Sequence, residues 1–154
     1  MESLSIINSE RLSYEDLIRI GDVVNFEGSL MTLFQHRKDN SLYIIDWVDR
    51  DETTNRWLIY QIDAYALNKY LHMEITHAQL FESLTSRPIF VADVAHGNTL
   101  QNTDIRMIAY LPSAYHPEQT FFDPDDCPSL AAIKKGIVNS LSSNAQNTPN
   151  LCNI

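Results

Sequence analysis

Residues 41–62, with the sequence SLYIIDWVDRDETTNRWLIYQI, limit the fold of this chain more than any other segment. Residues 41–48 and 56–62 are rich in β-branched and aromatic side chains, which favour β-strands. The charged and polar residues 49–55 between them are typical of a turn. The segment therefore predicts two neighbouring antiparallel strands joined by a charged turn.

The first of these strands is largely apolar on both faces. Side chains alternate along a strand, so two sets point in opposite directions. One set is Tyr43, Ile45 and Trp47, and the other is Leu42, Ile44, Asp46 and Val48. We therefore expect a central strand that is covered on both faces, by helices on at least one. Asp46 interrupts an apolar set and needs a partner or water, because burying an unpaired carboxylate is costly.

The rest of the pattern extends this strand pair into an α+β fold. Further extended runs lie at 23–26, 29–36, 89–94 and 105–111. Helices are expected at 14–20, capped by Ser13, and at 64–72, capped by Asp63. Two further helices are expected to begin after the caps Thr76 and Ser129 and to end near residues 84 and 141. These elements predict an antiparallel sheet of about five strands, a meander plus a hairpin, with helices packed on it.

The length of 154 residues predicts one domain. We place it at 1–141, followed by a flexible, Ser- and Asn-rich tail at 142–154. Prolines are concentrated in 112–128, which predicts an extended surface connection. Within this connection, Tyr115, Phe121 and Phe122 are expected to be held in the core.

The net charge of −9 bears on the choice of partner. It repels phosphate backbones, so direct nucleic-acid binding is disfavoured, and it suits either solubility or a basic protein partner. No apolar run reaches the ~18 residues of a membrane span, and the first residues do not resemble a secretory signal. Cys127 and Cys152 match neither a zinc site nor a disulfide framework. We expect a cytoplasmic protein without a cofactor, while the oligomeric state stays open.

The turn between the two aromatic strands holds the densest group of carboxylates, Asp46, Asp49, Asp51 and Glu52. Carboxylate oxygens are ligands for divalent cations, so a metal site is one interpretation. However, the turn lacks the glycine and the regular ligand spacing of a calcium loop, and turns favour Asp for backbone reasons alone. We therefore favour a charged turn without a metal.

Arg56 and Trp57 complete the set of candidate binding residues. We favour an exposed ion pair of Arg56 with Asp49 or Asp51, and the alternative is a buried, bidentate pair with Asp46. Trp57 and its expected neighbour Trp47 are predicted to be largely buried, although Trp57 would also suit an interface. The sequence contains no nucleophile elbow and no phosphate-binding loop.

Several short motifs carry a resemblance to a known family. They are Gly21-Asp22, the run from Phe26 to Leu30, the aromatic strand from Tyr43 to Asp49, and the run from Asn55 to Leu58. Together with residues 109–124, they resemble an uncharacterised family of small bacterial proteins, a domain of unknown function. Ser29 stands where that family has a proline. The resemblance implies a bacterial or phage setting and a small, partner-dependent protein, and it carries over neither an activity nor a catalytic residue.

Two functional hypotheses follow. The favoured one is a small, acidic, non-catalytic module that binds a protein, with an antitoxin-like, immunity-like or defence-accessory role. The alternative is a metal-dependent hydrolase or nuclease that uses Asp46, Asp49, Asp51 or Glu52. The first is motivated by the missing catalytic motifs and the acidic charge, and the second by carboxylates next to a rigid aromatic sheet.

Overall fold

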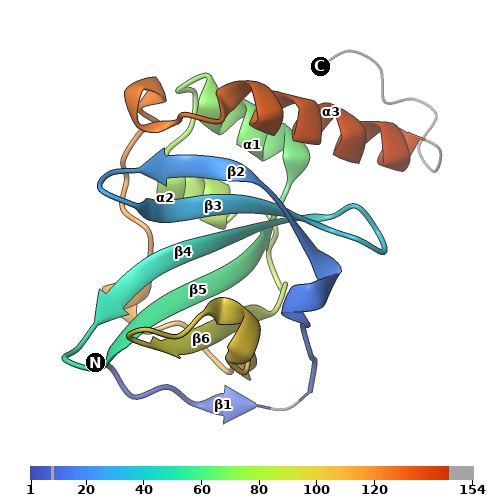
Figure 1. Cartoon of the computed structure of the whole chain (residues 1–154). Coiled ribbons are helices and arrows are strands. Elements are labelled where there is room, and N and C mark those ends of the chain that lie inside the picture. Colours follow the sequence, from blue (N-terminus) through green and yellow to red (C-terminus); the bar gives the residue numbers. More distant parts are fainter. Residues whose placement is uncertain (8, 146–154) are drawn as a thin grey trace.

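The computed structural model describes residues 1–7 and 9–145, which form a single open antiparallel sheet with helices packed against it (Figure 1). The α+β class is as predicted, but the described residues form seven strands instead of about five. Their order across the sheet is β1-β7-β6-β5-β4-β3-β2. The strands are β1 (Ile6–Ile7), β2 (Leu17–Asn25), β3 (Ser29–His36), β4 (Leu42–Arg50), β5 (Thr54–Ile62), β6 (Ile89–Ala95) and β7 (Arg106–Ile108).

The pairing of β4 with β5 is the one expected from the two aromatic runs. Ile45 lies opposite Ile59, and Trp47 lies opposite Trp57. The alternation along β4 divides the core as predicted. Leu42 and Ile44 belong to a large cluster on the helical side, and Ile45 belongs to a smaller cluster on the other side.

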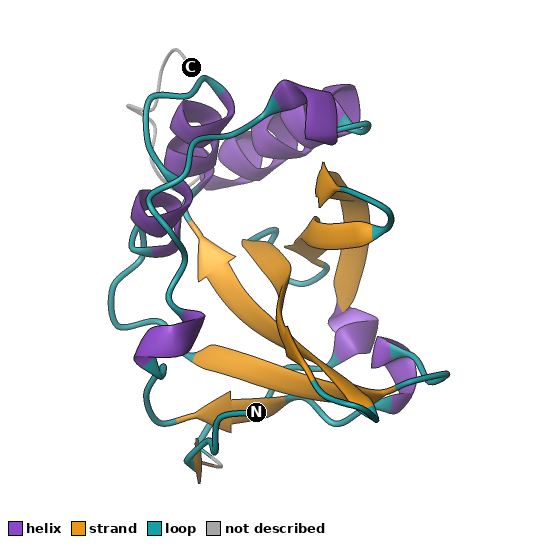
Figure 2. Ribbon diagram, turned by 90° about the vertical axis from the view of Figure 1, so that its left-hand side faces the viewer, coloured by secondary structure: helices purple, strands orange, loops and turns teal. Residues whose placement is uncertain are grey.

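Three α-helices cover the first of these faces: α1 (Ala64–Leu71), α2 (His77–Phe81) and α3 (Leu130–Ala145). Asp63 caps α1 by accepting a hydrogen bond from the Ala66 amide at 3.0 Å. Thr76 and Gln79 form the predicted capping box of α2, which ends three residues earlier than expected, at Phe81. Figure 2 shows the α-helices on one side of the curved sheet and short helical turns on the other.

The helix predicted at 14–20 is wrong. Residues Tyr14–Asp16 form only the 3-10 turn η1, and Ser13 makes no side-chain cap. Residues from Leu17 onward are strand β2, because they pair with the far end of β3 from His36 to Phe34. Burial of Leu17 in the smaller core cluster outweighs the local helical signal.

Close packing of α3 on β2 explains two glycines. A Cβ atom on Gly21 would lie 2.4 Å from the Cβ of Ser129, so only glycine permits this close approach. A Cβ on Gly136 would lie 3.2 Å from a methyl of Ile20. Helix α3 reaches Ala145, beyond the predicted end at 141, and residues 146–154 of the predicted tail lie outside the described residues.

The other differences concern the second half of the chain. The predicted strand at 105–111 is only Arg106–Ile108, and the loop before it contains the 3-10 turn η2 (Leu100–Asn102). The proline-rich segment contains two further turns, η3 (Ser113–Tyr115) and η4 (Pro124–Asp126). Tyr115 and Phe122 are buried as expected, whereas Phe121 is 58% exposed.

Candidate functional site

The predicted carboxylate cluster does not assemble. Asp46 is buried on the helical face of β4, and Asp49 accepts a hydrogen bond from the Tyr115 hydroxyl at 2.6 Å. Asp51 accepts from the backbone amides of Thr53 and Thr54, each at 2.9 Å, which is turn chemistry. Glu52 is exposed at the tip. Among the described residues, no three His, Cys, Asp or Glu side chains are arranged to hold a metal ion.

Both interpretations of Arg56 are wrong, because its partner is Asp93 on the neighbouring strand β6. The pair is bidentate, with Nε–Oδ1 and Nη2–Oδ2 distances of 2.7 and 3.0 Å. The Arg56 Nη1 also donates to the Glu2 carbonyl at 2.6 Å and to the Tyr115 hydroxyl at 2.9 Å. Hydrogen bonding to Asp93 outweighs burial and raises the pKa of Arg56. Arg56 as a whole is 7% exposed, and its guanidinium makes these hydrogen bonds inside the protein.

The β-register could have revealed this pair, because Arg56 and Asp93 lie directly opposite each other. Asp93 interrupts an otherwise apolar strand segment, which is the signal available in the sequence. Its pairing with Arg56 depends on β6 lying beside β5, because the two residues are 37 positions apart along the chain.

A second internal polar network surrounds Asp22 in the β2–β3 hairpin. Its carboxylate accepts hydrogen bonds from Arg19, Asn25, Ser29 and Thr32 at 2.7 to 3.0 Å. Burial acts to raise the pKa of Asp22, but these hydrogen bonds and the Arg19 charge outweigh it and lower the pKa. The carboxylate is fully used in holding the hairpin together.

Trp47 and Trp57 are largely but not fully buried, in line with their prediction, and Trp57 packs against the smaller core cluster. They lie opposite each other on β4 and β5, and the Trp47 indole donates to Asn55 Oδ1 at 3.1 Å. The sheet face that carries them is covered only in part, by residues of η1, η2 and their flanking loops such as Leu12 and Leu100. We call this face, with its buried centre of Phe34, Ile45, Ile59, Phe90, Ala92 and Val94, the open face.

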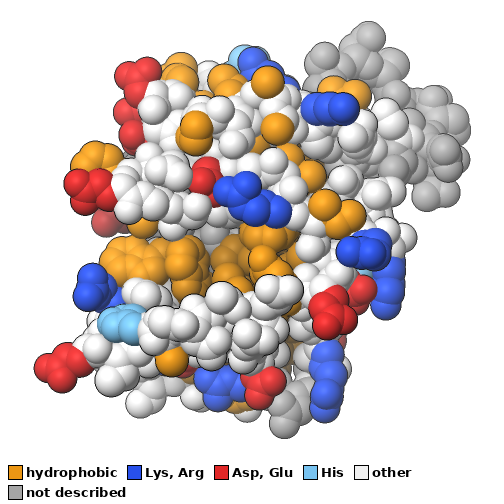
Figure 3. Space-filling model, viewed as in Figure 1, with side chains coloured by type: hydrophobic (Ala, Val, Ile, Leu, Met, Phe, Trp, Pro, Cys, Tyr) orange, Lys and Arg blue, Asp and Glu red, His pale blue; other side chains and the backbone are white. Residues whose placement is uncertain are grey.

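The space-filling view shows the open face from the front. Hydrophobic side chains gather in a hollow over β4 and β5, between the β2–β3 hairpin and the β6–η2 region (Figure 3). The hollow lies where β3 separates from β4, since their pairing ends at Met31 and Asp46. An apolar hollow on an otherwise charged molecule is typical of an interaction site.

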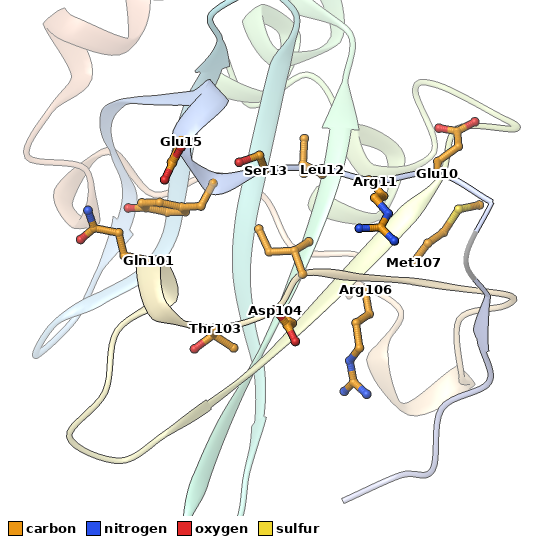
Figure 4. A pocket seen from close by; sticks show the side chains of 12 residues that line it. Glu10, Arg11, Leu12, Ser13, Glu15, Gln101, Thr103, Asp104, Arg106 and Met107 are labelled. Carbon is orange, nitrogen blue, oxygen red and sulfur yellow. The ribbon is translucent and has the colours of Figure 1, made fainter.

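Another cavity lies at the other end of the open face. It has a volume of about 510 Å³ and is enclosed by residues 10–15 and 101–107, whose side chains face one another across it (Figure 4). Leu12 and Ile105 supply apolar walls. Its charged side chains have both signs, so they do not select an anion or a cation: Glu10, Arg11, Glu15, Asp104 and Arg106.

A smaller cavity, which we call the Asp46 pocket, is lined by two polar side chains that sequence reasoning did not bring together, and both contact Tyr60. Its volume is about 260 Å³, and Asp46 and His77 line it. The Tyr60 hydroxyl donates to Asp46 Oδ2 at 3.2 Å and lies 2.8 Å from His77 Nε2. Burial and then the charge of Asp46 raise the pKa of Tyr60 well above its ordinary value, so the hydroxyl stays protonated.

Comparison with known proteins gives no further guide to the site. No family model, no curated protein and no solved structure matches this chain. None of the described helices has the length and apolar character needed to cross a membrane.

Proposed function

We propose that this protein is a non-catalytic module that binds a partner protein over the open face, with Trp47 and Trp57 as the anchoring side chains. The observation that carries the proposal is the partly exposed tryptophan pair on β4 and β5, the two strands over which the apolar hollow lies. Tryptophan is enriched among the residues that dominate binding energy, because it offers a large contact area with little conformational entropy to lose.

Rigidity of the support favours the same function. The two tryptophans project from the paired strands β4 and β5, whose neighbouring residues Ile45 and Ile59 are almost fully buried. A pair held in this way loses little further freedom when a partner binds, which raises affinity. The partner we propose has a basic and partly apolar surface, because the chain carries a net charge of −9.

The antitoxin-like, immunity-like or defence-accessory roles named for the non-catalytic module all require such a partner. The alternative of a metal-dependent hydrolase has less support, because Asp46 is buried on one face while Asp51 and Glu52 lie exposed in the turn. Calorimetric titration with magnesium, manganese and calcium tests it. Binding heat that is lost in Asp46→Asn would restore that alternative.

Affinity capture from the organism that encodes the chain tests the proposed function. We expect a protein to be retained in stoichiometric amount by the wild type and lost from Trp47→Ala and Trp57→Ala. The matched control is Phe121→Ala, which removes an exposed aromatic side chain from the segment between η3 and η4. Thermal melts must show that the tryptophan variants remain folded. Retention of the same partner by both tryptophan variants would contradict the proposal.

A further inference from the structure

We propose that the Asp46 pocket binds a lysine or arginine side chain of the partner, presented by an extended segment that lies along the free edge of β4. This inference rests on the proposed function and adds the chemistry that the partner must supply. The Asp46 pocket and the tryptophan pair meet at this edge, because Asp46 and Trp47 are adjacent residues of β4.

The pocket is built from three separate elements. Strand β4 supplies Asp46, Trp47 and Val48, helix α2 supplies His77, and the loop at 114–120 closes it. The loop is fixed to the start of α2, because the amides of His77 and Ala78 donate to carbonyls of Thr120 and Glu118 at 2.8 and 3.0 Å. The cavity of about 260 Å³ is therefore framed by backbone hydrogen bonds.

Asp46 has one carboxylate oxygen left for a ligand. Its Oδ2 is engaged by Tyr60 and lies 3.4 Å from His77 Nε2. No described group donates a hydrogen bond to Oδ1. Every fully buried side-chain oxygen of the described residues has a hydrogen-bond partner, so Oδ1 is not fully buried and reaches solvent. Asp46 as a whole is only 9% exposed, which directs that oxygen into the pocket it lines.

The charges around the pocket favour a cation. Asp46 and Glu118 contribute carboxylates, and neither Lys nor Arg occurs among the described residues that line it. His77 is held against Asp46 and Tyr60, and the ring of His116 contacts the Leu111 carbonyl at 3.2 Å. An ammonium or guanidinium group would complete the hydrogen bonding of Oδ1 with a charge-assisted bond.

The geometry of β4 explains how such a side chain could arrive. Pairing with β3 ends at Asp46, so the residues from Trp47 to Arg50 have a strand neighbour only on the β5 side. A segment added there would alternate its side chains between the two faces of the sheet. One side chain would enter the Asp46 pocket, and its neighbours would contact Trp47. The β-bulge after Trp47 and the charge of Arg50 keep this edge short, so the pocket supplies much of the selectivity.

The test uses a blocked pentapeptide, Val-Thr-Lys-Val-Thr, and its counterpart with norleucine in place of lysine. Backbone amide shifts of the full chain are followed by NMR during titration at low salt. We expect the lysine peptide to shift the amide signals of Trp47, Val48 and His77 and to bind at least tenfold more tightly than the norleucine peptide. Asp46→Asn, which keeps an acceptor for Tyr60, should remove that preference.

Two further variants keep the test decisive. Glu118→Gln removes an exposed charge at the pocket and should reduce the preference without affecting folding, even if Asp46→Asn is unstable. Glu74→Gln removes an exposed charge in the loop between α1 and α2, outside the residues that line the pocket, and should leave it unchanged. Equal binding of both peptides, shifts confined to other residues, or an equal effect of Glu74→Gln would overturn the inference.

Failure of this inference and failure of the proposed function are distinguishable. A partner that is lost from Trp47→Ala but retained by Asp46→Asn and Glu118→Gln would leave the proposed function standing and refute the pocket assignment. A partner that is retained by both tryptophan variants would refute the proposed function, whatever the peptide titration gives.

Discussion

Loss of either partner in the Arg56–Asp93 pair should be among the most damaging single changes to this fold. The side chain of Arg56 is 8% exposed and that of Asp93 is 22% exposed, so a substitution leaves the remaining charge largely inside the protein. Breaking a buried pair in this way costs ~3–5 kcal/mol, against ~5–15 kcal/mol for the total stability of a domain.

The two single substitutions should not be equal. In Arg56→Ala, Asp93 keeps Arg106 at 3.4 Å and some contact with water, so we expect a loss of ~3 kcal/mol. In Asp93→Ala, the guanidinium retains only the Glu2 carbonyl and the Tyr115 hydroxyl as acceptors among the described residues, and it cannot lose its proton. We therefore expect a larger loss, ~4–5 kcal/mol.

Urea unfolding of the wild type, both single variants and the double variant measures these values and their coupling. The coupling energy should exceed ~2 kcal/mol, because the second substitution removes a charge that the first has left unpaired. The control is the pair Arg56 and Asp49, because Asp49 accepts no hydrogen bond from Arg56. The coupling energy of this pair should stay below ~1 kcal/mol. An Arg56–Asp93 coupling below ~0.5 kcal/mol would refute the reasoning, and so would equal coupling in the two pairs.

Three further predictions concern other parts of the fold. The pKa of Asp22 is lowered in the folded protein, so its contribution to stability is present above the ordinary carboxyl pKa of ~3.9 and is lost as the pH falls through the lower folded value. In acid titration, the stability of Asp22→Asn should therefore fall less steeply below about pH 4 than the stability of the wild type. Gly21→Ala should lower stability by ~1–3 kcal/mol in thermal melts, because its new Cβ would meet Ser129, and Ser129→Gly should recover part of that loss. Phe122→Ala should cost ~3–5 kcal/mol in urea, whereas Phe121→Ala should change stability by less than ~0.5 kcal/mol, since only Phe122 is buried; similar losses would show that the exposures of the two rings are wrongly assigned.

What could be predicted from the sequence was local. The caps at Asp63 and Thr76 follow from side chains that reach backbone amides three residues away, so a short window contains all the information. The β4–β5 pair was also visible, because both strands and the turn between them are contiguous.

The errors concern choices that distant residues decide. Leu17 joins a strand because β3 pairs with it across the hairpin, although its neighbours have a helical pattern. Asp93 is the partner of Arg56 because β6 lies beside β5, and the two residues are 37 positions apart.

The candidate site shows the same division. The sequence identified Asp46 as a carboxylate that needs a partner, which is correct, since Tyr60 donates to it. It grouped Asp46 with Asp49 and Asp51 by closeness along the chain, although alternation and the turn send these side chains in different directions. His77, whose ring lines the Asp46 pocket, comes from a helix whose start the sequence predicts without relating it to β4.

The packing of α3 on β2 has a consequence for synthesis on the ribosome. Strands β2 to β6 each pair with the next strand along the chain, so the sheet can grow as the polypeptide emerges. The segment that covers β2 is made much later. The Cys127 thiol, which donates a hydrogen bond to the Asp22 carbonyl, lies 105 residues after Asp22, and α3 follows Cys127. Nascent chains halted before residue 127 should therefore expose β2 and recruit chaperones, and chains that include α3 should not.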